Sequence, residues 1–409
     1  MNQNRWLVVA GALLVQLCLG AIYSWSIFVE PLKKAFGYST TETQIIFSVA
    51  LASFALVMIF AGRLQDRIGP RIVATAGGIV LGLGYALASF TNGNFIALTL
   101  TVGLIGGAGI GLGYVCPIAA CVKWFPDKRG MVTGLAVAGF GAGAWLFQIV
   151  GSSLIESEPV LSAGLMKAFL YLGGIFFLTV VVGAQLLKNP PAGWLPEGWT
   201  PPAKKTPAGA VEDYNWNEML KTKQFWMLWL SFTFAATAGL MVIGILKPFG
   251  IWAGLDKLTA GSAVGILALF NGAGRILWGT ASDKIGRSKS MAFMFILQAA
   301  MMLVLIKMGS SGLLLAIASA WVGFNFGGNF ALFPSATADY FGTKNVGVNY
   351  GFVFTAYGVA GIIGPILGGQ VFDMTGNYKW AFIPTGILCA IAAVISLMLK
   401  HPHHEDKKK

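Results

Sequence analysis

Long apolar stretches separated by short polar segments follow one another along the whole chain. About 20 consecutive apolar residues are needed to cross a bilayer as a helix, so each stretch predicts one membrane-spanning helix. Six of them precede the middle of the chain, near residues 6–28, 43–62, 72–90, 95–122, 131–154 and 165–187. Six more follow, near residues 224–246, 259–280, 291–308, 312–333, 348–372 and 380–399. The pattern predicts an all-α membrane protein with about twelve transmembrane helices.

The polar segments divide the chain into four parts. We expect an N-terminal six-helix bundle over residues 1–187 and a C-terminal six-helix bundle over residues 224–400. Residues 188–223 between them are rich in proline, lysine and tryptophan, which is typical of a surface linker, with one amphipathic turn at 216–220. Residues 401–409 form a short tail.

Composition excludes a soluble domain. Of the 409 residues, 56% are hydrophobic and only 11% are charged. The four cysteines stand in apolar stretches without CxxC spacing, so we expect no disulfide framework, no metal site and no cofactor. The single Arg5 ahead of the first apolar run predicts a transmembrane helix rather than a cleaved signal peptide.

The net charge of +12 is explained by topology better than by nucleic-acid binding, because the basic residues stand singly in short loops. With a cytoplasmic N-terminus, 20 of the 28 lysines and arginines fall inside and seven, including Lys247, fall outside. The positive-inside rule therefore predicts a multi-pass protein of the cell inner membrane or plasma membrane, with both termini in the cytoplasm. We expect a monomer in the lipid bilayer and no nucleic-acid partner.

The two halves of the chain repeat each other at one constant offset. Gly62, Asp66 and Gly69 reappear 217 residues later, as part of a longer set of matches. The matches are Gly62 with Gly279, Asp66 with Asp283, Gly69 with Gly286, Pro117 with Pro334, Gly130 with Gly347, Gly134 with Gly351 and Gly141 with Gly358. An offset kept across several helices predicts a duplicated six-helix unit in parallel topology.

Charged loops occupy equivalent places in the two repeats, as GRLQDRIG and GTASDKIG. Charge-assisted hydrogen bonds from these loops can lock the cytoplasmic ends of neighbouring helices, and we interpret the loops as a gate. The alternative is a turn that only satisfies topology. The residues concerned are Gly62, Asp66, Arg67, Gly69, Gly279, Asp283, Lys284 and Gly286.

Arg275 stands inside an otherwise uncharged apolar segment, LFNGAGRILWG. A guanidinium at bilayer depth costs roughly 2.5 to 3.5 kcal/mol even on mild insertion scales, so it indicates a ligand or ion path by default. The 217-residue offset maps Arg275 onto Met58, so the charge is not part of the duplicated scaffold. The alternative is a structural carboxylate partner, but all 16 acidic residues fall in loops, tails or helix ends. We therefore expect Arg275 to bind a ligand anion, bidentately if it is a carboxylate.

Several uncharged residues are candidates to complete a site around Arg275. Asn271 lies one turn earlier on the same helix face, where its amide could bind a hydroxyl or keto oxygen or could equally join two helices. Aromatic side chains could form an apolar cup around a small substrate, with plain core packing as the alternative. These are Tyr114, Phe140, Phe330, Phe354 and Tyr357, of which Phe140 and Tyr357 are repeat partners expected to face each other.

Three motifs resemble a known family. The duplicated loop resembles the signature of the major facilitator superfamily. The WFPDKRG segment and the glycine and alanine run after it are similar to the start of the fifth helix in monocarboxylate transporters and oxalate:formate antiporters. Arg275 in FNGAGR matches the arginine that both groups keep in the eighth helix. The resemblance implies two bundles that alternate access to a midplane site, a substrate carboxylate on Arg275 and symport with a proton.

Two departures from the resembled families bear on substrate and coupling. Many monocarboxylate transporters carry an aspartate where this chain has Asn271, so proton coupling through that position is in question. The oxalate carriers have a second intramembrane cation, a lysine, where this chain has Tyr357. One cation suits one carboxylate, so the comparison favours a monoanion over a dianion.

Taken together, these features predict secondary transport of small monocarboxylates of lactate or pyruvate size, coupled to a proton. Neither glutamate, aspartate nor histidine is expected within the membrane to hold that proton, and Asp256 and tyrosine hydroxyls are the remaining candidates. One alternative is obligate carboxylate exchange of the oxalate:formate type. A membrane enzyme is disfavoured because HExxH and GxSxG are absent from the sequence, and a non-transporting sensor is a further alternative.

Overall fold

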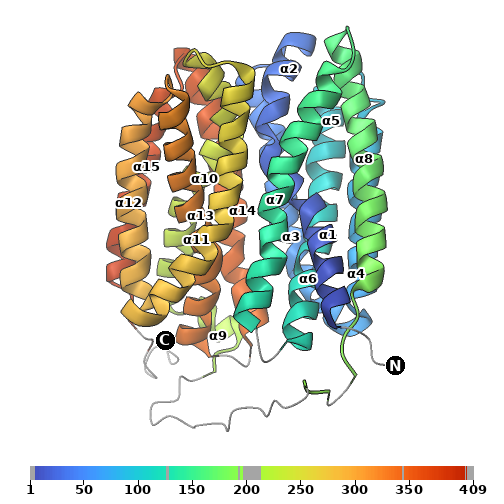
Figure 1. Ribbon diagram of the computed structural model, residues 1–409. Helices are drawn as coiled ribbons and strands as arrows, with labels where there is room; N and C mark the ends of the chain where they lie inside the picture. Colours follow the sequence, from blue (N-terminus) through green and yellow to red (C-terminus); the bar gives the residue numbers. More distant parts are fainter. Residues whose placement is uncertain are drawn as a thin grey trace.

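The computed structural model describes residues 5–125, 129–191, 194–196, 213–342, 345–400 and 402. Within them the chain is helical throughout, with long helices running side by side in two groups (Figure 1). Part of the WFPDKRG segment, most of the expected linker and nearly all of the tail lie outside the described residues.

The first half of the chain supplies one group of helices and the second half supplies the other. The first comprises α1 (Arg5–Leu19), η1 (Gly20–Ser24), α2 (Ser26–Phe36), α3 (Thr40–Ile68), α4 (Pro70–Ala88), α5 (Phe95–Leu98), η2 (Thr99–Gly106), α6 (Gly107–Trp124), α7 (Arg129–Glu156) and α8 (Leu161–Leu186). The second comprises α9 (Trp216–Leu220), α10 (Lys223–Trp252), α11 (Lys257–Ile285), α12 (Arg287–Met308), α13 (Gly312–Phe341), α14 (Val346–Thr375) and α15 (Lys379–Leu397).

The predicted all-α membrane architecture is confirmed. Eleven segments of the described chain are long and apolar enough to cross a membrane, and α7 is a further helix of 28 residues beside them. The short helix α9 also forms where an amphipathic turn was expected, and begins at a capping box made by Asn215 and Glu218.

The first predicted span differs from a single straight helix. It consists of α1, the short 3₁₀ segment η1, and α2. The tight turn brings Gly20 against α7, where a Cβ on Gly20 would fall 1.8 Å from the carbonyl oxygen of Phe140. This close approach requires glycine, and it places the next side chains of η1, including Tyr23, against the middle of α7.

The duplicated loops have the same backbone geometry. Gly69 joins α3 to α4 at φ +89° and ψ 156°, and Gly286 joins α11 to α12 at φ +87° and ψ 153°. Positive φ favours glycine because it has no Cβ, which explains why this residue recurs in both halves. The two loops thus confirm that the sequence repeat is a structural repeat.

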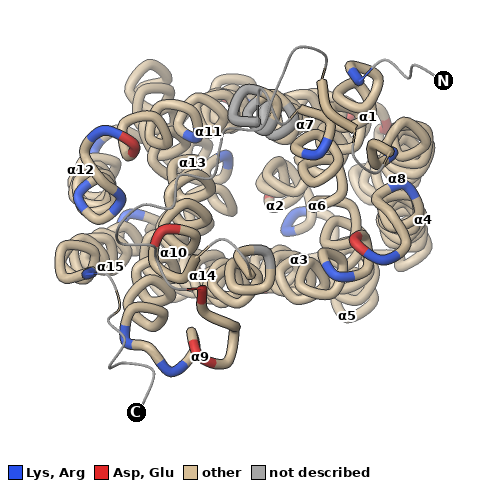
Figure 2. Tube along the Cα trace, turned by 90° about the horizontal axis from the view of Figure 1, so that it is seen from below, with Lys and Arg blue, Asp and Glu red and all other residues tan. Residues whose placement is uncertain are grey.

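The two bundles meet along paired helices. The helix α3 packs against α14 and α7 packs against α11, as Figure 2 shows along the helix axes from the end where the termini lie. At the opposite end, the Asp373 carboxylate on α14 accepts hydrogen bonds from the backbone N–H groups of Thr40 (2.9 Å) and Thr41 (2.7 Å). A carboxylate at a helix N-terminus is stabilised by the unpaired N–H groups and by the helix dipole. Asp373 therefore holds the two bundles together at this end.

Glycines bring α11 and α13 into backbone contact directly beside Arg275. A Cβ on Gly274 would fall 1.9 Å from the Phe324 carbonyl oxygen, and one on Gly327 would fall 2.0 Å from the Asn271 carbonyl oxygen. Close packing of this kind drives helix association in a bilayer, where lipid offers no hydrophobic advantage. The helix that carries Arg275 is thus positioned by contacts that admit no side chain.

We expect Gly274→Ala to separate α11 from α13 and to lower the thermal unfolding temperature of the purified protein in detergent. The added methyl group overpacks the contact, which costs about 1 to 3 kcal/mol. Gly272→Ala is the matched control, because nothing lies within 4 Å of the Cβ position there. That variant should unfold at or slightly above the parent temperature, since alanine favours a helix over glycine. Equal unfolding temperatures for the two variants would contradict the packing argument.

Candidate functional site

Arg275 is held between the two bundles by neutral groups. Its Nε donates to Asn271 Oδ1 at 3.2 Å, one turn earlier on α11, and its Nη1 donates to the Tyr114 hydroxyl at 3.4 Å, on α6 of the other bundle. Its guanidinium carbon lies 4.3 Å from the centre of the Phe330 ring on α13. Only 9% of the residue is exposed. These contacts orient the cation without neutralising it.

No carboxylate among the described residues forms an ion pair with Arg275. Arg287, at the end of the same bundle, shows the contrast, because it pairs with Asp283 at 2.7 Å and with Asp339 at 2.8 Å. A buried cation without a counter-ion is strongly disfavoured unless an anion joins it. The alternative of a structural carboxylate thus finds no support in the part of the chain that the structure describes.

Asn271 adds an unused donor to this arrangement. Its side chain is 2% exposed, its Oδ1 accepts from Arg275, and its Nδ2 has no hydrogen-bond partner among the described residues. A buried amide N–H without a partner costs roughly 1 to 3 kcal/mol, so it favours an acceptor from outside the chain. The arginine and the amide together present donors to one ligand.

Aromatic rings surround the polar centre. The Tyr114 ring meets Phe54 at 5.1 Å and Phe140 at 5.6 Å, and the Phe354 ring stacks on Tyr357 at 4.9 Å between centroids. These rings come from α3, α6, α7 and α14, so both bundles contribute to the cluster. Edge-to-face and stacked arrangements of this kind stabilise aromatic pairs.

A tyrosine pair joins the two bundles beside the arginine. The hydroxyls of Tyr23 on η1 and Tyr357 on α14 lie 3.0 Å apart, and both side chains are buried. The Tyr23 ring also packs edge-on against Phe140 at 5.1 Å. Tyr23 therefore links Phe140 with Tyr357, the repeat partners that were expected to face each other directly.

The structure brings together all the residues that the sequence proposed for the substrate site. These are Tyr114, Phe140, Asn271, Arg275, Phe330, Phe354 and Tyr357. It adds Tyr23, Phe54 and Phe326, which sequence reasoning missed. The Phe326 ring on α13 lies 5.9 Å from Tyr23 and 5.4 Å from Phe330 between centroids. Phe54 could have been found, because it is the residue that the 217-residue offset pairs with Asn271. Tyr23 could not, since its position depends on the 3₁₀ turn at η1.

Comparison with known proteins agrees with this architecture. A family model for the Major Facilitator Superfamily matches residues 11–251 and 233–409. The chain belongs to the major facilitator superfamily. A bacterial homologue of the human lysosomal transporter Spinster, solved in an inward-facing and unoccupied conformation, has the same fold at a TM-score of 0.70, with 17% identity and 97% of each chain covered.

Curated relatives lie within the same superfamily. The uncharacterised MFS-type transporter YhjX of Escherichia coli is 33% identical over 88% of this chain and 87% of its own. The oxalate:formate antiporter of Oxalobacter formigenes is 32% identical over 96% of this chain and 91% of its own. Monocarboxylate transporter 12 of Xenopus laevis is 26% identical over 97% and 90%. The expected superfamily is thus confirmed.

The duplicated superfamily loops connect helices within each bundle. Asp66 Oδ1 lies 3.4 Å from Lys123 Nζ on α6, which ties the end of α3 to the end of α6. In the second half the equivalent tie is made by Arg287, through Asp283 and Asp339. Arg67 and Lys284, the basic residues expected in these ties, are exposed instead.

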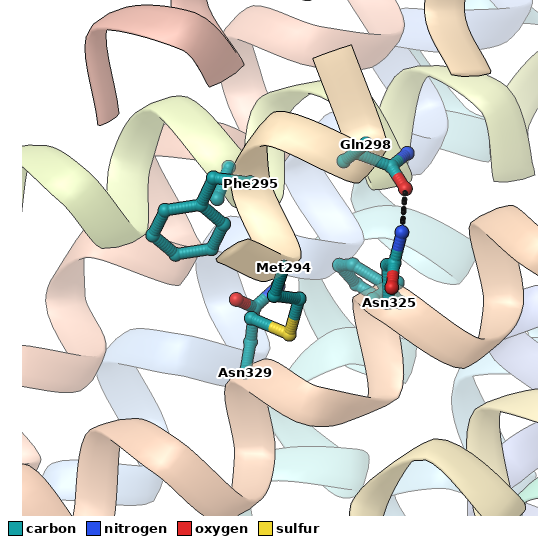
Figure 3. Close-up of a pocket in the computed structure, with 7 residues that line it drawn as sticks. Met294, Phe295, Gln298, Asn325 and Asn329 are labelled. Atoms are coloured by element: carbon teal, nitrogen blue, oxygen red, sulfur yellow. Dashed lines mark hydrogen bonds between the residues drawn. The ribbon is translucent and has the colours of Figure 1, made fainter. Parts of the chain in front are cut away.

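A network of side-chain hydrogen bonds connects α11 to α13 and α12. Trp278 Nε1, one turn after Arg275, donates to Asn325 Oδ1 at 3.2 Å, and Asn325 Nδ2 donates to Gln298 Oε1 at 3.2 Å. Figure 3 shows the Asn325 and Gln298 side chains beside a cavity of about 10 Å³, which is also lined by Asn329. That volume suits about one water molecule. The network therefore links three helices of the C-terminal bundle, α11, α13 and α12.

We expect Asn325→Leu to lower the unfolding temperature, because it leaves the buried Trp278 N–H and the Gln298 amide without partners. Each such group costs about 1 to 3 kcal/mol. In the double variant with Gln298→Leu, only the indole N–H stays unpaired, so the loss should be smaller than the sum of the two single losses. Unfolding measurements that give strictly additive losses would contradict the network.

Proposed function

We propose that the chain transports small monocarboxylates of lactate or pyruvate size across the cytoplasmic membrane as a secondary transporter. The observation that carries the proposal is Arg275, a buried guanidinium between the bundles that has neutral partners and no ion pair among the described residues. A carboxylate would supply the missing charge with bidentate hydrogen bonds.

The neighbours of Arg275 favour a small hydroxy or keto acid. Asn271 Nδ2 is a free donor one turn away, suited to an oxygen beside the carboxylate. The Phe330 and Phe354 rings offer apolar contact for a methyl group. Tyr357, where the oxalate carriers carry a lysine, brings a hydroxyl rather than a second charge, which favours one carboxylate over two.

We infer that residues 1–187 and 224–400 rock against each other as two units to alternate access to Arg275. The positive-inside distribution favours cytoplasmic termini, with the linker at 188–223 and the tail on the same side. In that orientation the Asp373 contacts with Thr40 and Thr41 close the outer side. The superfamily loops around Asp66 and Asp283 tie helix ends within each bundle here, and in this scheme they form the inner gate when the bundles close on that side. The protein acts as a monomer.

Proton symport is the proposed coupling, with carboxylate exchange as the second candidate. Asp256 is a poor proton carrier, because hydrogen bonds from Thr259 hold the pKa of this exposed carboxyl below its usual range. The hydrogen-bonded hydroxyls of Tyr23 and Tyr357 are the better candidates to pass a proton near Arg275. Similarity to an oxalate:formate antiporter is the observation that favours exchange.

The decisive experiment is uptake of labelled L-lactate into proteoliposomes with and without an inward proton gradient. We expect the gradient to stimulate the parent, and Arg275→Gln to lower uptake at least about tenfold through loss of the charge-assisted pair. Arg63→Gln, which removes an exposed arginine from the end of α3, is the control and should match the parent.

The alternatives give different results in the same vesicles. Uptake that requires carboxylate on the far side and ignores both the gradient and a protonophore would identify an exchanger. If Arg275→Gln transports and binds L-lactate as well as the parent, Arg275 is not the substrate site.

Specificity provides a second prediction. Tyr357→Lys places a second cation beside Arg275, so we expect oxalate to become an effective competitor of L-lactate uptake. Tyr357→Phe is the matched control, because it removes the hydroxyl bond to Tyr23 without adding charge. Competition by oxalate that stays at the parent level in Tyr357→Lys would contradict the one-cation argument.

A further inference from the structure

Lys247 is a second buried cation, although it follows directly after the span predicted near residues 224–246 and was counted among the basic residues of the outer side. The helix α10 continues through Lys247 and Pro248 to Trp252, so the lysine lies inside a helix and only 8% of it is exposed. Its Nζ donates to Ser152 Oγ at 3.1 Å, on α7 of the other bundle. Both residues stand in the last two turns of their helices, α10 and α7, whose C-terminal ends lie opposite the chain termini (Figure 1).

No ion pair among the described residues neutralises Lys247. The nearest acid along α7 is Glu156, one turn after Ser152, and its carboxylate lies 3.5 Å from Lys257 instead. An ammonium group that is removed from water needs a counter-charge, and one serine hydroxyl supplies none. Lys247 therefore shares with Arg275 the lack of an ion pair among the described residues.

A third polar side chain gathers at the same junction. A Cβ on Gly261 of α11 would fall 2.3 Å from Gln148 Nε2 and 3.8 Å from Lys247 Cε, so both side chains lie over this glycine. Gln148 is 6% exposed. An ammonium, a hydroxyl and an amide thus converge from α10 and α7 over α11, and all three can donate hydrogen bonds to an anion.

We propose that the Lys247 ammonium group is a second anion site, which binds the substrate carboxylate on its way from the outer side to Arg275, and that Ser152 and Gln148 cover it when the bundles are closed at this end. This inference rests on the proposed transport of monocarboxylates. Gly261 and Arg275 are 14 residues apart on α11, or about 21 Å along the helix axis, so the two cations lie in sequence along one path.

The serine makes the outer site responsive to the state of the bundles. Lys247 belongs to one bundle and Ser152 to the other, so separation of the bundles at this end frees the ammonium group to bind a carboxylate. Closure returns the Ser152 hydroxyl to Lys247 and displaces the anion toward Arg275. A cation in an open mouth also raises the local concentration of anions and speeds their entry.

The test compares carboxylate affinity on the two sides of the membrane, in right-side-out and inside-out vesicles with labelled L-lactate. We expect Lys247→Met to raise the outer KM about tenfold, because it removes a charge-assisted hydrogen bond. The inner KM should stay within about twofold of the parent, which also shows that the variant is folded. Lys247→Arg keeps the charge and should restore most of the outer affinity.

Ser152→Ala separates an anion site from a simple latch. It removes the cross-bundle hydrogen bond but leaves the cation, so we expect it to keep the outer KM of the parent. An unchanged outer KM in Lys247→Met, an equal rise on both sides, or the same effect from Ser152→Ala would each overturn the outer site while leaving the proposed function in place. A parent protein that carries no L-lactate would overturn the proposed function, and this site with it.

Discussion

The structure depends on a positive charge that is held between two helical bundles and has no ion pair among the described residues. Arg275 is stabilised by an amide oxygen, a phenol and an aromatic face, which lower the cost of burial but leave the charge uncompensated. Because Tyr114 belongs to one bundle and Asn271 to the other, the contacts of this single side chain span the interface. An anion bound there would interact with both bundles at once, which is the physical requirement for coupling binding to their movement.

The two halves of the chain share a duplicated helical scaffold, but the substrate site depends on a residue that the duplication does not repeat. The loops at Gly69 and Gly286 share one backbone geometry, so each half folds by the same local rules. The charged centre appears in one half only, since Met58 occupies the position equivalent to Arg275. Close glycine contacts between α11 and α13, with the amide network behind them, make that half a rigid support for the charge.

The two buried cations have different surroundings that suit different tasks. Arg275 lies at the centre of an aromatic cluster, where its planar fork suits stable and oriented binding. Lys247 touches a hydroxyl of the opposite bundle near one end of the molecule, where a compact and flexible ammonium suits brief contact. The same end of the molecule is held closed by the Asp373 carboxylate, which binds the N-terminus of α3. Lys247 therefore lies at the end where the bundles are closed.

Apolar length and the constant offset were enough to predict about twelve membrane helices arranged as a repeat, because a bilayer permits few ways to satisfy a backbone. The superfamily was predicted from the resemblance of the duplicated loop and two further motifs. The cost of a charge in an apolar run was likewise enough to single out Arg275. The positions and contacts of Tyr23 and Lys247, by contrast, were set only by the tertiary structure. A 3₁₀ turn against the backbone of Phe140 directs Tyr23 to Tyr357, and the extension of α10 past Pro248 buries Lys247 against Ser152. Contacts between residues more than ninety positions apart leave no periodic signal along the chain, so only the packed helices could reveal them.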